Sequence, residues 1–154
     1  MLLTQEEGKL WAENQIEYVR MQIDLSNPWN VKRTNQDLIK SICSIKKTRK
    51  NKISDNLAEY LQMIANLLQQ QKAEPSTDFR HKEALMHAFG LLNLHIAPDQ
   101  NFAQTAVHLL QDSCFVELES NHGPMRARAA WVYGQFAQFE FDDLALKQIL
   151  DKLY

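Results

Sequence analysis

The sequence predicts an all-α fold built from short helices that pack in pairs. Only four glycines and four prolines occur in 154 residues, too few turn-forming residues for a many-stranded β-fold. Apolar residues recur at helical spacing, and helix breakers separate the resulting segments. We place the helical segments at 4–13, 15–24, 35–48, 52–72, 78–96, 99–119, 124–139 and 142–153.

Segments 35–48 and 52–72 each carry one apolar stripe, and segments 78–96 and 99–119 each carry a broader apolar face. The stripe of 35–48 comprises Leu38, Ile39, Ile42, Cys43 and Ile45, and that of 52–72 comprises Ile53, Leu57, Tyr60, Leu61, Ile64, Leu67 and Leu68. The faces of 78–96 and 99–119 comprise Ala84, Leu85, Ala88, Phe89, Leu91 and Leu92, then Phe102, Ala106, Leu109, Leu110 and Val116. The stripes fit packing on one side, and Pro98 is well placed to start the helix over 99–119.

Segment 124–139 is apolar almost all the way round, which predicts an inner helix covered on more than one side. Gly123 allows the chain to turn, and Pro124 suits a first helical position, which needs no hydrogen-bonded N–H. Arg126 and Arg128 are separated by about 200° around the helix, so they cannot share a face. At least one is expected to be structural, because a buried guanidinium must be paired. Trp131 and Phe136 are expected in the core rather than in a partner pocket.

Antiparallel helix pairs that recur at about 40 residues are typical of HEAT-like arrays. A bundle of eight short helices would show the same periodicity, so the pattern alone leaves both open. Neither end of the array looks like a polar cap. The first helix carries Leu2, Leu3, Leu10 and Trp11, and the last carries Leu144, Leu146, Ile149, Leu150 and Leu153.

Charge and composition argue against several classes of protein. The net charge of −2 does not suit a strongly basic nucleic-acid binder, although residues 32–52 hold eight Lys or Arg against one acid. From Glu74 onward there are eleven acids against six bases, which suits either basic partners or an ordinary solvated surface. Acids near the N-terminus do not fit a secretory signal, and no apolar run approaches about 18 residues. We expect a soluble intracellular protein that does not bind membranes.

No catalytic, metal or cofactor signature is present in the sequence, so we expect a protein that is not an enzyme. His87 and His95 lack ligand-spaced neighbours, and Cys43 and Cys114 fit buried free thiols. The basic run Lys46–Lys52 resembles a nuclear localisation or phosphate-binding patch, but cations at the end of a helix complement its dipole, so a nucleic-acid role is not expected. Trp29, which follows Pro28 in a loop, suits either a packing lid or a binding anchor.

Three blocks of sequence, in order, resemble the importin-β (karyopherin-β) family of nuclear transport receptors, within it the branch containing importins seven and eight. The blocks are Lys9-Leu10-Trp11 with Glu17-Tyr18-Val19-Arg20-Met21 and Asp24, then Asp78 to Gly90, then Met125-Arg126-Ala127-Arg128-Ala129-Ala130-Trp131-Val132. The resemblance favours an α-α superhelix of HEAT type over a bundle. Because members of the family are several times longer, it implies a single run of about three to four repeats over 1–154 that belongs to a longer receptor.

The resemblance also implies what such a receptor binds. It implies basic cargo proteins on a concave surface, the GTP form of Ran, and Phe-Gly nucleoporins, with shuttling between cytoplasm and nucleus through the pore. The alternative is a stand-alone helical-repeat scaffold for protein interactions without transport activity. The family has no short motif for these contacts, so the partner-binding residues and the helices of the concave face stay open.

Overall fold

The computed structural model describes residues 2–23, 31–45, 55–74 and 78–153, and these ranges contain helices but no strand. In chain order the elements are α1 (Gln5–Glu13), α2 (Gln15–Ile23), α3 (Val31–Ser44), α4 (Asp55–Ala73), α5 (Arg80–Gly90), α6 (Asn93–Ile96), α7 (Gln100–Leu109), the π-helix η1 (Leu110–Cys114), the 3₁₀-helix η2 (Phe115–Glu119), α8 (Gly123–Gln135) and α9 (Asp143–Leu153). The predicted all-α class is therefore confirmed.

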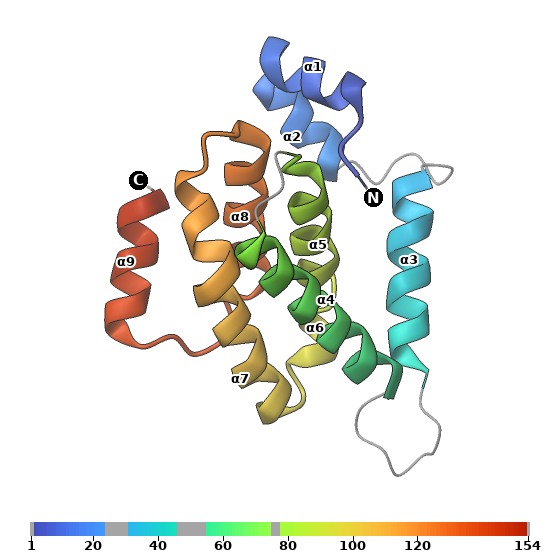
Figure 1. Ribbon diagram of the computed structural model, residues 1–154, viewed down its shortest axis with the longest axis vertical. Coiled ribbons are helices and arrows are strands. Elements are labelled where there is room, and N and C mark those ends of the chain that lie inside the picture. The colour runs from blue at the N-terminus through green and yellow to red at the C-terminus, as the bar shows by residue number, and fades with distance from the viewer. Residues whose placement is uncertain (1, 24–30, 46–54, 75–77, 154) are drawn as a thin grey trace.

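From α3 onward the chain alternates between two layers of helices (Figure 1). We call α3, α5 and α8 the A layer, and α4, α7 with η1 and η2, and α9 the B layer. Helix α4 packs against both α3 and α5, and the η1–η2 segment packs against α8, with α9 on its far side. The result is a row of three helix pairs, the arrangement that a helical-repeat array requires.

The A-layer helices run in the same direction, as the side chains that join them show. Gln36 of α3 contacts His87 of α5, and Ser44 at the end of α3 contacts His95 of α6, which follows α5 in the chain. Between α5 and α8, Glu83 pairs with Arg128 and Phe89 stacks on Phe136 with ring centroids 4.7 Å apart. Residue numbers rise together on each pair of neighbours, so the three N-termini lie at the same end of the layer.

The hairpin of α1 and α2 does not stack beside α3 as a fourth pair but lies across this end of the A layer (Figure 1). Trp11 packs edge-on against Tyr18 at 5.2 Å, which joins the two helices, and Tyr18 is 2% exposed. The Trp11 indole also rests on Gly123 at the start of α8, where a Cβ atom would overlap it. Gly123 is thus needed for this close approach, whereas its backbone does not have the positive φ that would require glycine for a turn.

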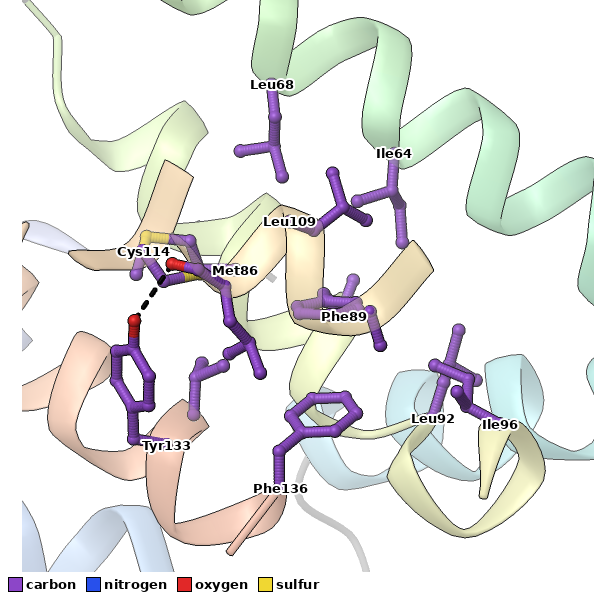
Figure 2. Packing of buried hydrophobic residues seen from close by; sticks show 14 of the residues in the cluster. Ile64, Leu68, Met86, Phe89, Leu92, Ile96, Leu109, Cys114, Tyr133 and Phe136 are labelled. Atoms are coloured by element: carbon purple, nitrogen blue, oxygen red, sulfur yellow. Dashed lines mark hydrogen bonds between the residues drawn. The ribbon is translucent and has the colours of Figure 1, made fainter. Parts of the chain in front are cut away.

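The core lies between the two layers and draws on α4, α5, η1 and α8 (Figure 2). On α4 it receives Leu57, Leu61, Ile64 and Leu68 at helical spacing, all at most 3% exposed. Phe89 and Phe136 are fully buried at its centre. Burial of a large aliphatic side chain contributes about 1.5–3 kcal/mol, so this cluster supplies most of the favourable free energy of folding.

The prediction of one helix over 78–96 is wrong, because the chain turns between α5 and α6. The Gly90 backbone lies against the Trp131 indole so closely that a Cβ atom would overlap the ring. Directly after it, the Leu92 N–H donates to the Phe89 carbonyl at 3.0 Å, a three-residue bond that tightens the chain and ends the α-helix.

The prediction of a continuous helix over 99–119 is also wrong, since α7 gives way to η1 and η2. In the widened π-turn the Leu110 carbonyl accepts from the Phe115 N–H and also from the Tyr133 hydroxyl, the latter at 2.9 Å. At the other end, Asp99 rather than Pro98 caps the helix, since its carboxylate accepts from the N–H groups of Asn101 and Phe102.

Other boundaries differ from expectation by a few residues. Helix α8 begins at Gly123 and ends at Gln135, so the predicted extension to 139 is wrong; the chain turns there as Phe139 packs on Phe136 with centroids 5.0 Å apart. Helix α3 begins at Val31, four residues before the prediction, and ends at Ser44. Residues 46–48 and 52–54 of the predicted segments lie outside the described residues.

The stripe predicted for α3 is the larger correction. Ile39 and Cys43 face the rest of the protein, whereas Leu38 and Ile42 are 56% and 43% exposed. The two sets lie about 100° apart around the helix, so the predicted stripe combined residues of two separate faces.

Candidate functional site

A chain of buried and half-buried polar side chains joins the hairpin to the N-terminal ends of all three A-layer helices. Arg128 of α8 and Glu83 of α5 form an ion pair with 2.6 Å between Nε and Oε1, and their side chains are 6% and 1% exposed. The Arg128 guanidinium also donates to Gln22 of α2 at 3.1 Å. Gln22 in turn donates to the Glu7 carboxylate of α1 at 3.0 Å, and Glu7 pairs with Lys32 of α3. The five side chains therefore connect five helices.

The local sequence fixes Glu7 before it joins this network. Thr4 and Glu7 form a capping box, in which the Thr4 N–H donates to Glu7 at 2.8 Å and the Glu7 N–H donates to the Thr4 hydroxyl at 3.2 Å. Burial raises the pKa of Glu7, but the hydrogen bonds from Lys32, Thr4 and Gln22 outweigh it and hold the pKa below its ordinary value of 4.5. Glu7 is therefore ionised at neutral pH.

His87 lies beside the network and stays neutral. Its ring is 3% exposed, lies edge-on to Trp131 at 5.2 Å, and contacts Gln36 through Nε2 at 3.2 Å. Burial lowers the pKa of His87 to about 2, and the nearby charge of Arg128 adds to the effect. Its Nδ1 atom is buried without a hydrogen-bond partner in the described structure. His87 therefore has the environment of a core residue.

The arrangement is suited to holding helices together and not to catalysis. It contains no nucleophile next to a base, and the described residues include no group of three side chains placed to bind a metal ion. A buried ion pair adds little net stability, but removing one partner costs about 3–5 kcal/mol because the other charge is left unpaired. The network therefore connects the hairpin to the A layer, and breaking one of its buried charges should weaken that connection.

A separate open groove runs along α7 beside the turn that follows α8, with a volume of about 730 Å³. Its apolar part is formed by Pro98, Ala103, Val107 and Phe139, and glutamines and Glu140 surround it. An apolar side chain flanked by polar groups would fit such a surface. Beyond the groove the chain exposes Asp142 and Asp143, which make this end of the protein acidic.

The structure separates the residues that the sequence singled out. Arg128 is the buried, paired arginine, while Arg126 is exposed and donates to the Ser120 carbonyl at 2.6 Å. Phe136 is in the core, and Trp131 is half-buried with the Arg128 guanidinium 5.0 Å from its ring centre. Cys43 and Cys114 are buried free thiols, as predicted, and His95 is half-buried against Ser44. Trp29 and Lys46–Lys52 lie outside the described residues.

Sequence reasoning missed most of the polar network. Thr4 and Glu7 have the spacing of a capping box, and Glu83 is an acid within the apolar face of α5, so these parts of the network could have been recognised in the sequence. Gln22 and Lys32 could not have been recognised in the sequence, because their roles depend on how the hairpin folds back over α3 and α8. None of the described helices is long and apolar enough to cross a membrane.

Comparison with known proteins finds relatives that align with almost the whole chain. It is 26% identical to importin-8 of Mus musculus and of Homo sapiens over 152 residues, which is 98% of this chain and 14% of each relative. It is 25% identical over 146 residues to the importin beta-like SAD2 homolog of Arabidopsis thaliana, 93% of this chain and 14% of that protein. No protein-family model and no solved structure matches the chain.

The relatives confirm the resemblance that the three sequence blocks indicated. They imply that the three helix pairs are HEAT repeats of an α-α superhelix. Receptors of this family are not enzymes, which agrees with the lack of any catalytic motif in the sequence. The chain spans about one seventh of the length of the curated relatives it matches. Along almost its whole length the chain is therefore similar to a segment of importin-β family proteins, within the branch that contains importin-8.

Proposed function

We propose that the chain is a run of HEAT repeats from a nuclear import receptor that binds cargo proteins, Ran-GTP and nucleoporins and shuttles through the nuclear pore. The observation that carries this proposal is the alignment to importin-8 along 98% of the chain. A match of that extent includes both layers of the array and the hairpin, so it is not the chance likeness of one helix.

The groove along α7 supports a contact with Phe-Gly nucleoporins. Its apolar part, around Val107 and Phe139, is the right chemistry for a phenylalanine ring, and the polar rim suits the hydrophilic spacers of such repeats. The groove is open, so binding there would be weak and quickly reversible, as passage through a pore requires. Next to it, Glu140, Asp142 and Asp143 are exposed and suit basic cargo.

The first test is titration of a fluorescent Phe-Gly repeat peptide with the 154-residue protein. We expect saturable binding that is lost when the phenylalanines of the peptide become alanine. Ala103→Arg should abolish binding by filling the groove, whereas the matched control Leu94→Arg, on a side chain that is 70% exposed outside the groove, should leave it unchanged. Equal binding by both variants would place any nucleoporin contact elsewhere.

Transport itself needs the native protein. The size of the polypeptide in its source cells, read with an antibody against this segment, separates a receptor from a stand-alone scaffold. A product several times larger than 17.9 kDa that captures Ran loaded with a GTP analogue, and not Ran-GDP, would support the receptor. A product of 17.9 kDa that ignores both forms of Ran would favour the scaffold and refute the transport proposal.

A further inference from the structure

Helix α7 presents two rows of side chains to the open groove that runs along it. The first row is apolar and consists of Ala103 and Val107, both half-buried. The second row is polar and consists of Gln100, Gln104 and His108, all exposed. Within each row successive residues are four apart, so the two rows run side by side along the helix. We call Gln100, Gln104 and His108 the polar row.

The polar row takes no part in holding the fold together. None of its three side chains forms a hydrogen bond with another described residue. By contrast, Gln22 and Gln36 each contact a side chain of another helix. A glutamine amide offers both donors and an acceptor, and a histidine ring carries two nitrogen atoms that can form hydrogen bonds. One wall of an apolar groove is therefore lined by hydrogen-bonding groups that the protein itself does not use.

The spacing of the polar row matches the main chain of an extended peptide. Four residues of an α-helix rise about 6 Å, so the row advances about 12 Å from Gln100 to His108. In an extended chain the groups that point to the same side recur every second residue, and two such steps advance about 13 Å. Flexible glutamine side chains easily cover the difference. A helical peptide would not offer these groups, because its N–H and C=O groups bond to one another.

The other residues of the groove favour an uncharged peptide that carries an aromatic side chain. They include Gln138, Phe139 and Glu140, from the turn that follows α8. The half-buried Phe139 ring offers a surface on which a second aromatic ring can stack. Among the described residues that line the groove, Glu140 is the only acid, and there is no lysine or arginine. The groove thus combines apolar contact with main-chain recognition and has little charge of its own.

We propose that the polar row hydrogen-bonds to the main chain of an extended peptide while a phenylalanine of that peptide packs between the apolar row and Phe139. This inference rests on the nucleoporin contact proposed above, and it adds the residues that hold the peptide and the conformation in which the peptide binds. The polar row distinguishes an extended Phe-Gly segment from an apolar helix, which offers no free main-chain groups at this spacing.

Replacing glutamine with leucine separates main-chain recognition from apolar contact. Gln104→Leu enlarges the apolar surface of the groove, so binding by apolar contact alone should become tighter. If the polar row holds the main chain, Gln104→Leu should instead weaken binding of the fluorescent Phe-Gly peptide about three- to tenfold, and Gln100→Leu/Gln104→Leu should weaken it further. The matched control is Gln70→Leu, which changes an exposed glutamine of α4 outside the groove and should bind like wild type. All three positions are exposed, so the variants should fold alike by circular dichroism.

Methylation of the peptide tests the same hydrogen bonds from the other side. Methyl groups on the main-chain nitrogen atoms of the phenylalanine and its two neighbours remove N–H donors but keep every side chain. This peptide should bind at least about threefold more weakly than the unmodified one. In NMR titrations of the intact protein with the unmodified peptide, the side-chain amide signals of Gln100 and Gln104 should shift, while that of Gln70 should not.

The outcomes separate this inference from the contact on which it rests. If Ala103→Arg abolishes binding, but Gln104→Leu and the methylated peptide bind as tightly as the unmodified partners or more tightly, the groove holds phenylalanine by apolar contact alone. That result would refute the role of the polar row and leave the nucleoporin contact in place. If Ala103→Arg leaves binding unchanged, or if no peptide binds, the contact in the groove is refuted and the role of the polar row with it.

Discussion

Replacing Arg128 with methionine should be among the most destabilising single changes in the described protein. The substitution keeps much of the side-chain volume but removes the 2.6 Å bond to Glu83, the 3.1 Å bond to Gln22 and the contact with the face of Trp131. It leaves the Glu83 carboxylate, whose side chain is 1% exposed, without its counter-ion. Loss of one partner of a buried pair costs about 3–5 kcal/mol, against a total stability of about 5–15 kcal/mol for a typical domain.

A double-mutant cycle separates this effect from simple loss of packing. Glu83→Leu alone should destabilise the protein by a similar amount, because it strands the Arg128 guanidinium. The double variant Glu83→Leu/Arg128→Met removes both charges and should recover at least about 2 kcal/mol relative to the sum of the single changes. Urea unfolding followed by circular dichroism measures each free energy, with the slope against urea expected to stay constant.

The matched control is Arg126→Met, two residues away. Arg126 is exposed and makes one bond, to the Ser120 carbonyl, so its loss should cost no more than about 1 kcal/mol. If Arg128→Met costs less than about 1 kcal/mol, or if the two changes at 83 and 128 are additive, the network does not hold the hairpin on the A layer and the reasoning fails.

Three further predictions concern pH and close packing. His87 has a folded pKa of about 2 against an ordinary value of 6.5, so between these limits the unfolded chain binds more protons than the folded protein. The free energy of unfolding should therefore fall by about 2 kcal/mol from pH 7 to pH 5. In urea unfolding at each pH, His87→Gln should reduce this dependence on pH, and an unchanged dependence would contradict the burial of a neutral ring. Glu7 has a folded pKa below its ordinary value of 4.5, so its contribution to the stability of the fold is present above pH 4.5 and is lost as the pH falls below that value. Glu7→Gln should remove this loss of stability in acid, seen as a smaller change in tryptophan fluorescence on acidification. Gly123→Ala should cost about 1–3 kcal/mol in thermal unfolding because its methyl group meets the Trp11 indole, whereas Gly134→Ala, in open space on the same helix, should be neutral or stabilising.

The helical class and most core positions could be read from sequence, because they depend on local spacing. The apolar residues of α4 at 57, 61, 64 and 68 recur every three or four positions and all are buried. The all-round apolar character of α8 correctly indicated a helix with neighbours on several sides. Likewise the pairing rule for a buried guanidinium predicted a structural arginine, although only the structure selects Arg128.

Features that arise from contacts between distant segments could not be predicted. At the end of α5 Gly90 lies against the Trp131 indole, and at the π-turn the Leu110 carbonyl accepts from the Tyr133 hydroxyl, each a contact with another helix. The helical spacing of apolar residues continues through both positions and so predicts uninterrupted helices there. The α3 error has a different origin, since Leu38 and Ile39 are adjacent in sequence but belong to faces with different surroundings.

The parallel course of α3, α5 and α8 has an electrostatic consequence for the hairpin that covers their ends. Each helix presents the positive end of its macrodipole there, equivalent to about half an elementary charge. The hairpin brings Glu6, Glu7, Glu13 and Glu17 to this end against only Lys9 and Arg20. An acidic hairpin thus acts as the counter-charge of three aligned dipoles. Its attachment should weaken with added salt while the apolar core between the layers does not.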